Sequence, residues 1–64
     1  MDLKEAREKA GLSLETLAKA TGVSAAAISR YEHGIRAPRI HIAKKLGELL
    51  GVPWYEIIDN KKAG

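Results

Sequence analysis

The feature that most constrains the fold is a pattern that occurs twice, 11 residues apart. Each copy has an apolar residue, then a serine, then a second apolar residue four positions after the serine: Leu12, Ser13 and Leu17 in the first copy, and Val23, Ser24 and Ile28 in the second. A serine hydroxyl at this place accepts a hydrogen bond from the first helical turn, and the flanking apolar pair packs across that turn. The pattern therefore predicts helices that begin directly after Ser13 and after Ser24.

The connection between these two helices is very short. It consists of Thr21, Gly22 and Val23, and the glycine can take the left-handed conformation that ends a helix. Two capped helices joined by a three-residue turn with a central glycine form a helix-turn-helix motif.

Apolar spacing and helix-ending residues predict three further helices, which makes the chain an all-α fold of five short helices. We expect them at about 2–10, 14–20, 25–32, 39–50 and 54–58. Gly11, Gly34 and Gly51 stand at the ends of three of them, and Pro53 stands at the start of the last. One domain should cover residues 1–59, and residues 60–64 form a frayed C-terminal tail.

Two helices should present apolar stripes to a common core. In the helix over 39–50 the stripe is predicted to be Ile40, Ala43, Leu46 and Leu50. Gly47 interrupts that helix, which would be explained by the close approach of another helix. The apolar face of the helix over 54–58 should consist of Trp54, Ile57 and Ile58.

Length and composition exclude several classes of function. A chain of 64 residues makes one domain at most and has no room for a deep catalytic cleft beside a core. It contains no cysteine, and no cluster of carboxylates or histidines suggests a catalytic or metal site. Its longest uncharged run is ten residues, whereas a membrane-spanning helix needs about 20. We therefore expect a cytoplasmic protein that is not an enzyme and has no cofactor, metal, small-molecule ligand or membrane partner.

The net charge of +3 is carried by the second half of the chain. Residues 1–34 have five basic and five acidic side chains, whereas residues 35–64 have six basic and three acidic ones. Two of the basic residues, Arg36 and Arg39, flank Pro38 directly after the helix over 25–32. A local excess of positive charge attracts a polyanion such as nucleic acid.

Four blocks of the sequence carry a resemblance to a known family. They are GLSLETLAKATGVS (residues 11–24), ISRYEHG (residues 28–34), Pro38, and LGELLGVPWYEII (residues 46–58). In this order and spacing the chain resembles the phage repressor/Cro-type (XRE-type) helix-turn-helix domains, with their lambda-repressor-like fold. The resemblance implies a sequence-specific, double-stranded-DNA-binding transcriptional regulator, more often a repressor, that acts as a homodimer and places the helix over 25–32 in the major groove.

The resemblance also implies roles for particular residues. Bases would be faced by Ser24, Ala25, Ala26, Ser29 and Arg30. The DNA backbone would be contacted by Ser13, His33, Arg36 and Arg39. Arg7 would form a partly buried ion pair with Glu32, and Trp54, Tyr55 and Ile58 would form a dimer surface or belong to the core.

This chain departs from the family pattern at two places. Leu14 stands where the family commonly has a backbone-contacting glutamine, and Ala25 to Ala27 stand where it commonly has polar side chains. Alanine strongly favours helix, and its methyl group can touch a thymine methyl. The three alanines are therefore explained either by helix stability or by contact with DNA. Arg30 would read a base, contact a phosphate or lie in solvent. His33 would touch phosphate or merely end its helix.

Two alternative functions share the fold. In a protein-interaction module, Leu14, Ala25 and Ala26 would form an apolar docking patch, and DNA binding would have been lost. In the antitoxin component of a toxin–antitoxin pair, the domain would bind DNA and also cap a toxin. Arg30, Arg36 and Arg39 on one side of the molecule would favour DNA binding over the first alternative.

Overall fold

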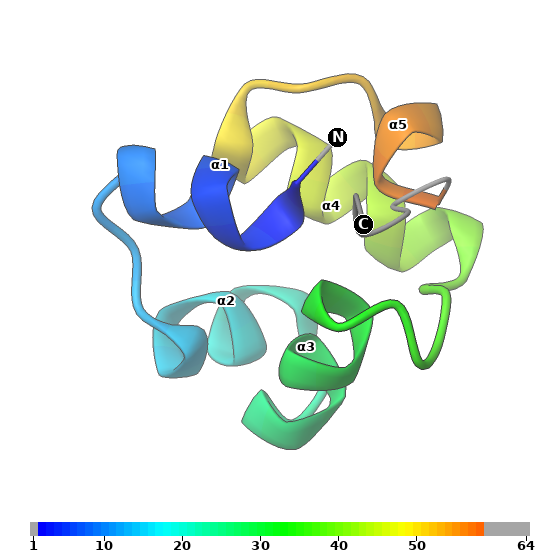
Figure 1. The fold of residues 1–64 in the computed structure, drawn as a ribbon, viewed down its shortest axis with the longest axis horizontal. Helices are drawn as coiled ribbons and strands as arrows, with labels where there is room; N and C mark the ends of the chain where they lie inside the picture. Colours follow the sequence, from blue (N-terminus) through cyan, green and yellow to red (C-terminus); the bar gives the residue numbers. More distant parts are fainter. Residues whose placement is uncertain (1, 59–64) are drawn as a thin grey trace.

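The computed structural model describes residues 2–58, and within them it contains five α-helices and no β-strand. The helices are α1 (Leu3–Lys9), α2 (Leu14–Thr21), α3 (Ala25–Glu32), α4 (Ile40–Leu50) and α5 (Trp54–Ile58). α2 and α3 lie together below α1 and α4, and α5 lies on the far side of α4 from them (Figure 1). The prediction of five helices is confirmed, while the predicted tail over 60–64 lies outside the described residues.

Side-chain caps set where three of the helices begin. The hydroxyl of Ser13 accepts from the Thr16 backbone N–H at 3.1 Å, and the hydroxyl of Ser24 accepts from the Ala27 N–H at 3.1 Å. Asp2 caps α1 by accepting from the Glu5 N–H at 3.2 Å, so that helix starts one residue later than the sequence predicts. Arg39 occupies the equivalent position before α4, which also starts one residue later than predicted.

The end of α3 is a tight reversal that depends on Gly34. This glycine has a φ of 71°, and the next N–H, that of Ile35, reaches back to the Arg30 carbonyl at 3.0 Å. The Gly34 N–H also bonds the Tyr31 carbonyl, at 3.2 Å. These two bonds close the helix with a Schellman motif and direct the chain into the loop over 35–39.

Each helix contributes one large, fully buried side chain to the core. These are Leu3, Leu17, Ile28, Leu46 and Ile57. Ala27, Tyr31, Ile42 and Ala43 fill the space between them. The half-buried residues Leu12, Leu14 and Val23 pack against this core from the helix entries, as the predicted staples require.

The predicted apolar stripe of α4 is wrong at its first position. Ile40 is 55% exposed, and Ile42 is buried in its place. The true stripe therefore runs through Ile42, Ala43 and Leu46, which stand at positions i, i+1 and i+4 of the helix. Ile40 opens the helix directly after the loop, so its side chain points away from the face that packs on the core.

A smaller expectation, about the apolar face of α5, also needs correction. Trp54 remains 36% exposed, so Ile57 with half-buried Ile58 forms the inner face of α5. Ala10 follows the end of α1 and is exposed, which leaves Leu3 as the buried residue of that helix.

Gly47 lies where α4 meets the segment that enters α5. A Cβ atom added at this position would stand 2.6 Å from the Val52 carbonyl oxygen and 3.3 Å from the Trp54 backbone nitrogen. Only a residue without a side chain lets the two segments pack this closely. The glycine predicted to mark a close helix approach therefore does so.

Candidate nucleic-acid interface

An ion pair fixes the position of α3 relative to α1. Arg7 Nε lies 2.5 Å from Glu32 Oε2, and Arg7 Nη1 donates to the Leu12 carbonyl oxygen at 3.0 Å. The Glu32 side chain is 4% exposed and that of Arg7 13%. The hydrogen bond to Glu32 raises the pKa of Arg7 above its ordinary value, so this guanidinium is charged throughout the neutral range. The ion pair expected between these two residues is thus present.

The outward side of α3 is defined by three exposed residues. Ala26, Arg30 and His33 follow one another at helical spacing and face the same direction. Ala25 and Ser29, also expected to face bases, are half-buried and form the edge of this surface. The single acidic residue of α3, Glu32, lies on the inner side, so the exposed side of the helix carries a cation and no carboxylate.

The two cap serines lie exposed at the entries of α2 and α3, with their hydroxyl oxygens already accepting a backbone N–H. Ser13 also shares a hydrogen bond of 2.9 Å with the hydroxyl of Thr16, one turn into α2. Thr16 is exposed and adds a second hydroxyl at this helix start, which sequence reasoning did not single out. The sequence signal that could have found Thr16 is its position three residues after a cap serine.

His33 ends α3 and is held against the helix by its own ring. Its Nδ1 lies 2.7 Å from the Ser29 carbonyl oxygen and 3.5 Å from the Ser29 hydroxyl. Because a carbonyl oxygen only accepts, Nδ1 carries the proton in the shorter contact. Nε2 of this exposed residue is then an acceptor in the neutral ring and donates to a phosphate oxygen only when the ring is protonated.

The loop after α3 brings four basic side chains around one surface hollow. Arg36 and Arg39 come from the loop, and His41 and Lys45 come from the first turns of α4. The hollow is completed by the α2–α3 turn and by Tyr31, and none of the described residues that line it is a carboxylate. Arg36 and Arg39 were predicted to lie at this surface, whereas His41 and Lys45 were not. The sequence signal that could have found them is that His41 and Lys45 are four residues apart and directly follow a loop with two arginines.

Comparison with known proteins assigns the family. The sequence pattern described as helix-turn-helix matches residues 3–57, which is most of the chain. The chain belongs to the XRE-type helix-turn-helix family. That family supports DNA binding and transcription regulation as the class of function, and its members are normally regulators rather than enzymes.

Three relatives show how far the likeness extends. The chain is 44% identical over 57 residues to an HTH-type transcriptional regulatory protein of Methanocaldococcus jannaschii, covering 89% of this chain and 18% of that protein. It is 38% identical over 52 residues to the uncharacterised HTH-type transcriptional regulator YqaF of Bacillus subtilis, covering 81% of this chain and 68% of YqaF. It is 45% identical over 53 residues to the HTH-type transcriptional repressor RghR of Bacillus subtilis, covering 81% of this chain and 39% of RghR. The chain thus spans only part of these relatives, and no solved structure gave a significant match.

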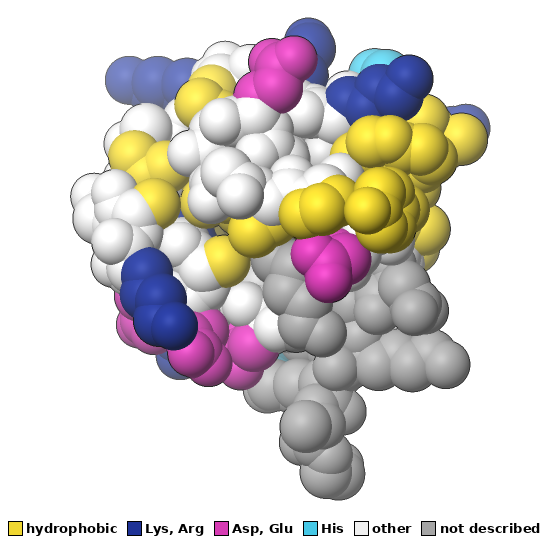
Figure 2. Space-filling view, turned by 90° about the horizontal axis from the view of Figure 1, so that it is seen from above, with side chains coloured by type: hydrophobic (Ala, Val, Ile, Leu, Met, Phe, Trp, Pro, Cys, Tyr) yellow, Lys and Arg dark blue, Asp and Glu magenta, His cyan; other side chains and the backbone are white. Residues whose placement is uncertain are grey.

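The helix-turn-helix domain has a second notable surface, formed by α5 and Lys44 of α4. Tyr55 is 61% exposed, its ring meets that of Trp54 edge-on with 5.9 Å between centroids, and Ile58 is half-buried. Lys44 Nζ lies 5.6 Å from the centre of the Trp54 ring, within the range of a cation–π contact. Figure 2 shows hydrophobic side chains gathered on one side of the face seen from above, with basic side chains at their edge. We call Trp54, Tyr55 and Ile58 the apolar patch.

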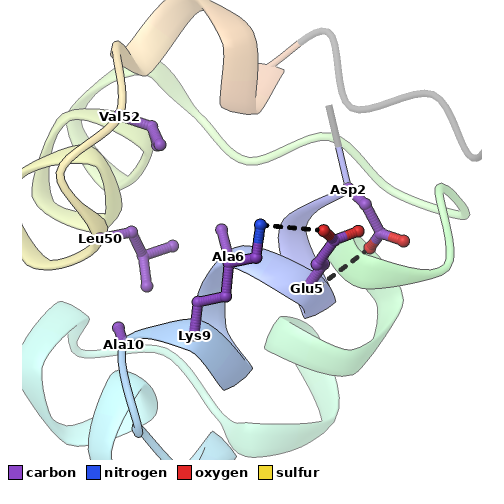
Figure 3. Close-up of a pocket in the computed structure, with 7 residues that line it drawn as sticks. All are labelled: Asp2, Glu5, Ala6, Lys9, Ala10, Leu50 and Val52. Carbon is purple, nitrogen blue, oxygen red and sulfur yellow. Dashed lines mark hydrogen bonds and ion pairs between the residues drawn. The ribbon is translucent and has the colours of Figure 1, made fainter.

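Another groove of the domain lies elsewhere and has a different character. It separates α1 from the end of α4 and is lined by Asp2, Glu5, Ala6, Lys9, Ala10, Leu50 and Val52 (Figure 3). Its charged side chains are engaged with one another or with the backbone, since Lys9 pairs with Glu5 at 3.1 Å and Asp2 caps α1. Within residues 2–58 no three histidine or carboxylate side chains converge as a metal site would require, and none of the described helices has the length and apolar character needed to span a bilayer.

Proposed function

We propose that this domain is a sequence-specific regulator of transcription that binds double-stranded DNA with α3 in the major groove. The observation that carries the proposal is the charge arrangement of α3. Its acidic residue is buried and paired with Arg7, while Arg30 stands on the exposed side between Ala26 and His33. A helix so arranged can approach a polyanion without electrostatic repulsion from its own surface.

Base reading in this proposal depends mainly on Arg30. An arginine can donate two hydrogen bonds to guanine O6 and N7, a contact worth about 1–3 kcal/mol of discrimination. Ala26, one turn earlier, presents a methyl group that fits a thymine methyl. Ser24 adds a hydroxyl at the helix entry, and Ala25 and Ser29 contribute at the edge. With so few polar readers, selectivity also relies on how easily the DNA deforms.

Positioning on the duplex is assigned to the residues around this helix. Arg36 and Arg39 on the loop, His33 at the end of α3, and Ser13 at the start of α2 would contact phosphates, which set orientation without reading sequence. A binding mode dominated by such contacts predicts a strong dependence of affinity on salt concentration.

The proposal includes a homodimer that joins through the apolar patch. Exposed aromatic side chains next to apolar ones commonly mark a protein interface. A symmetric dimer would present two copies of α3 about 34 Å apart, one helical turn of DNA. A cytoplasmic location follows from the proposed DNA target. Repression as the sign of regulation is supported by the likeness to RghR, of which the chain spans 39%.

The alternative functions receive less support. The docking patch of a protein-interaction module would need Leu14 and Ala25 exposed, but both are half-buried and Leu14 packs against the core. No particular feature of the described residues favours an antitoxin over a simple regulator.

The test is a selection of bound sequences from a pool of random duplex DNA. The wild type should enrich a motif that contains guanine, and Arg30→Ala should lose preference at that base while retaining most of its non-specific affinity. Lys9→Ala, on the groove side of α1, is the matched control and should leave the motif unchanged. Failure of the wild type to bind duplex DNA at any salt concentration would refute the proposed function. Enrichment that survives Arg30→Ala would refute only the role of Arg30.

A further inference from the structure

The basic hollow beside the α3–α4 loop is lined by two basic residues besides Arg36 and Arg39, the two arginines assigned to phosphate contacts. His41 and Lys45 stand one helical turn apart on α4, so both side chains project to the same side as the two arginines. The hollow has a volume of about 370 Å³ and opens to the surface. It is therefore accessible to an anionic group from outside.

The charged side chains that line the hollow with His41 are all basic. Arg36 and Arg39 approach from the loop and Lys45 from α4, whereas the α2–α3 turn and Tyr31 bring no carboxylate. Glu48, the carboxylate of α4, lines a separate hollow beside Trp54. Glu32 is held by Arg7 on the inner side of α3. Among the described residues that line the hollow, His41 therefore has only basic or neutral neighbours.

Such a site suits a phosphodiester, and histidine gives it a property that lysine and arginine lack. A neutral imidazole has one N–H donor and one acceptor nitrogen, whereas the protonated ring has two donors and a positive charge. Histidine side chains change charge between about pH 5 and pH 8. A phosphate in the hollow favours the charged ring, so binding of the anion and uptake of the proton are linked.

We propose that this hollow holds a phosphate of the DNA backbone and that His41 contacts it in the protonated form, so that DNA affinity rises as the pH falls from 8 to 6. The proposal rests on the DNA-binding function proposed above. It adds His41 and Lys45 to the interface and makes binding sensitive to cellular pH.

The experiment measures the dissociation constant for one labelled duplex of fixed sequence across a salt series, at pH 6 and at pH 8. The wild type should bind about two- to fivefold more tightly at pH 6, the range that an exposed ion pair supplies. The slope of log K against log salt should also steepen by up to about 0.9 at pH 6. His41→Gln should lose most of both changes.

Two further variants separate the hollow from other sources of pH dependence. His33→Gln removes the other histidine near the interface, which is also proposed to contact a phosphate, and should keep the larger part of the gain at pH 6. Lys45→Ala should flatten the salt slope at both pH values, because its charge does not change between them. Circular dichroism checks that each variant is folded, as is expected for exposed positions.

The outcomes distinguish this inference from the function on which it rests. A wild type that binds no duplex at either pH refutes both. Binding whose pH dependence is undiminished in His41→Gln, or disappears in His33→Gln, overturns the role of His41 and leaves DNA binding standing. A wild type whose DNA affinity does not change with pH also overturns the role of His41 and leaves DNA binding standing.

Discussion

At the scale of single residues, Arg7 connects three parts of the fold through one guanidinium. It pairs with Glu32 at the end of α3, donates to the Leu12 carbonyl in the α1–α2 connection, and belongs to the last turn of α1. The carboxylate it neutralises is almost completely buried. Removal of the arginine would leave that charge without a partner in a poorly solvated place, which is far more costly than the loss of a surface pair.

We therefore expect Arg7→Ala to lower the free energy of unfolding by about 3–5 kcal/mol. Urea denaturation followed by circular dichroism measures it. Lys9→Ala provides the control, because it breaks the exposed Lys9–Glu5 pair two residues away, and such pairs contribute about 0.3–0.5 kcal/mol. Equal stability of the two variants would show that the buried pair does not hold α1 to α3.

At the scale of elements, the α4–α5 corner depends on the absence of a side chain. α5 is only five residues long and could not persist alone, so its helical state relies on packing against α4. That packing brings the Val52 carbonyl and the Trp54 backbone against Gly47. Backbone atoms cannot yield as a flexible side chain can, and the corner is therefore intolerant of added volume.

Gly47→Ala should destabilise the domain, although alanine favours helix by about 1 kcal/mol over glycine. Overpacking typically costs about 1–3 kcal/mol, so we expect a net loss that is visible as a fall in Tm. Glu48→Ala, at the exposed neighbouring position, changes helix propensity without filling the corner and should leave the Tm nearly unchanged. A Tm for Gly47→Ala equal to or above that of the wild type would contradict the close contact.

At the scale of the whole molecule, the two proposed interfaces use different surfaces of the domain. α3 and its loop would face DNA, and the apolar patch on α5 would face a second copy. Both are needed for tight binding in this proposal, because one copy of α3 offers few base contacts and two linked copies bind with a higher effective concentration.

Tyr55→Glu should convert a dimer to a monomer without unfolding the domain, since Tyr55 is largely exposed. Sedimentation velocity reports the mass, and the salt-dependent DNA affinity should fall in parallel. Leu49→Glu is the matched control, because it also replaces an exposed apolar side chain with glutamate but lies on another side of α4. A wild type that is monomeric both free and on DNA would rule out the proposed dimer.

The predictions made from sequence succeeded where local rules decide the outcome. Ser13, Ser24 and Gly34 mark helix ends because their capping bonds reach only three to five residues along the chain. The choice between Ile40 and Ile42 in α4 failed, since both registers fit an apolar stripe and only the neighbouring helices decide between them. His41 and Lys45 were missed because the hollow exists only once the loop over 35–39 folds back beside α4.

The placement of the alanines on α3 has an evolutionary consequence. The residues that hold this helix in place, among them Ile28, Tyr31 and Glu32, all lie on its inner side. Ala26 and Arg30 lie outside, so substitutions there change the stability of the domain little. In the proposed DNA-binding mode, gene copies that differ at these two positions could thus acquire new target sequences by single mutations while inheriting the same scaffold.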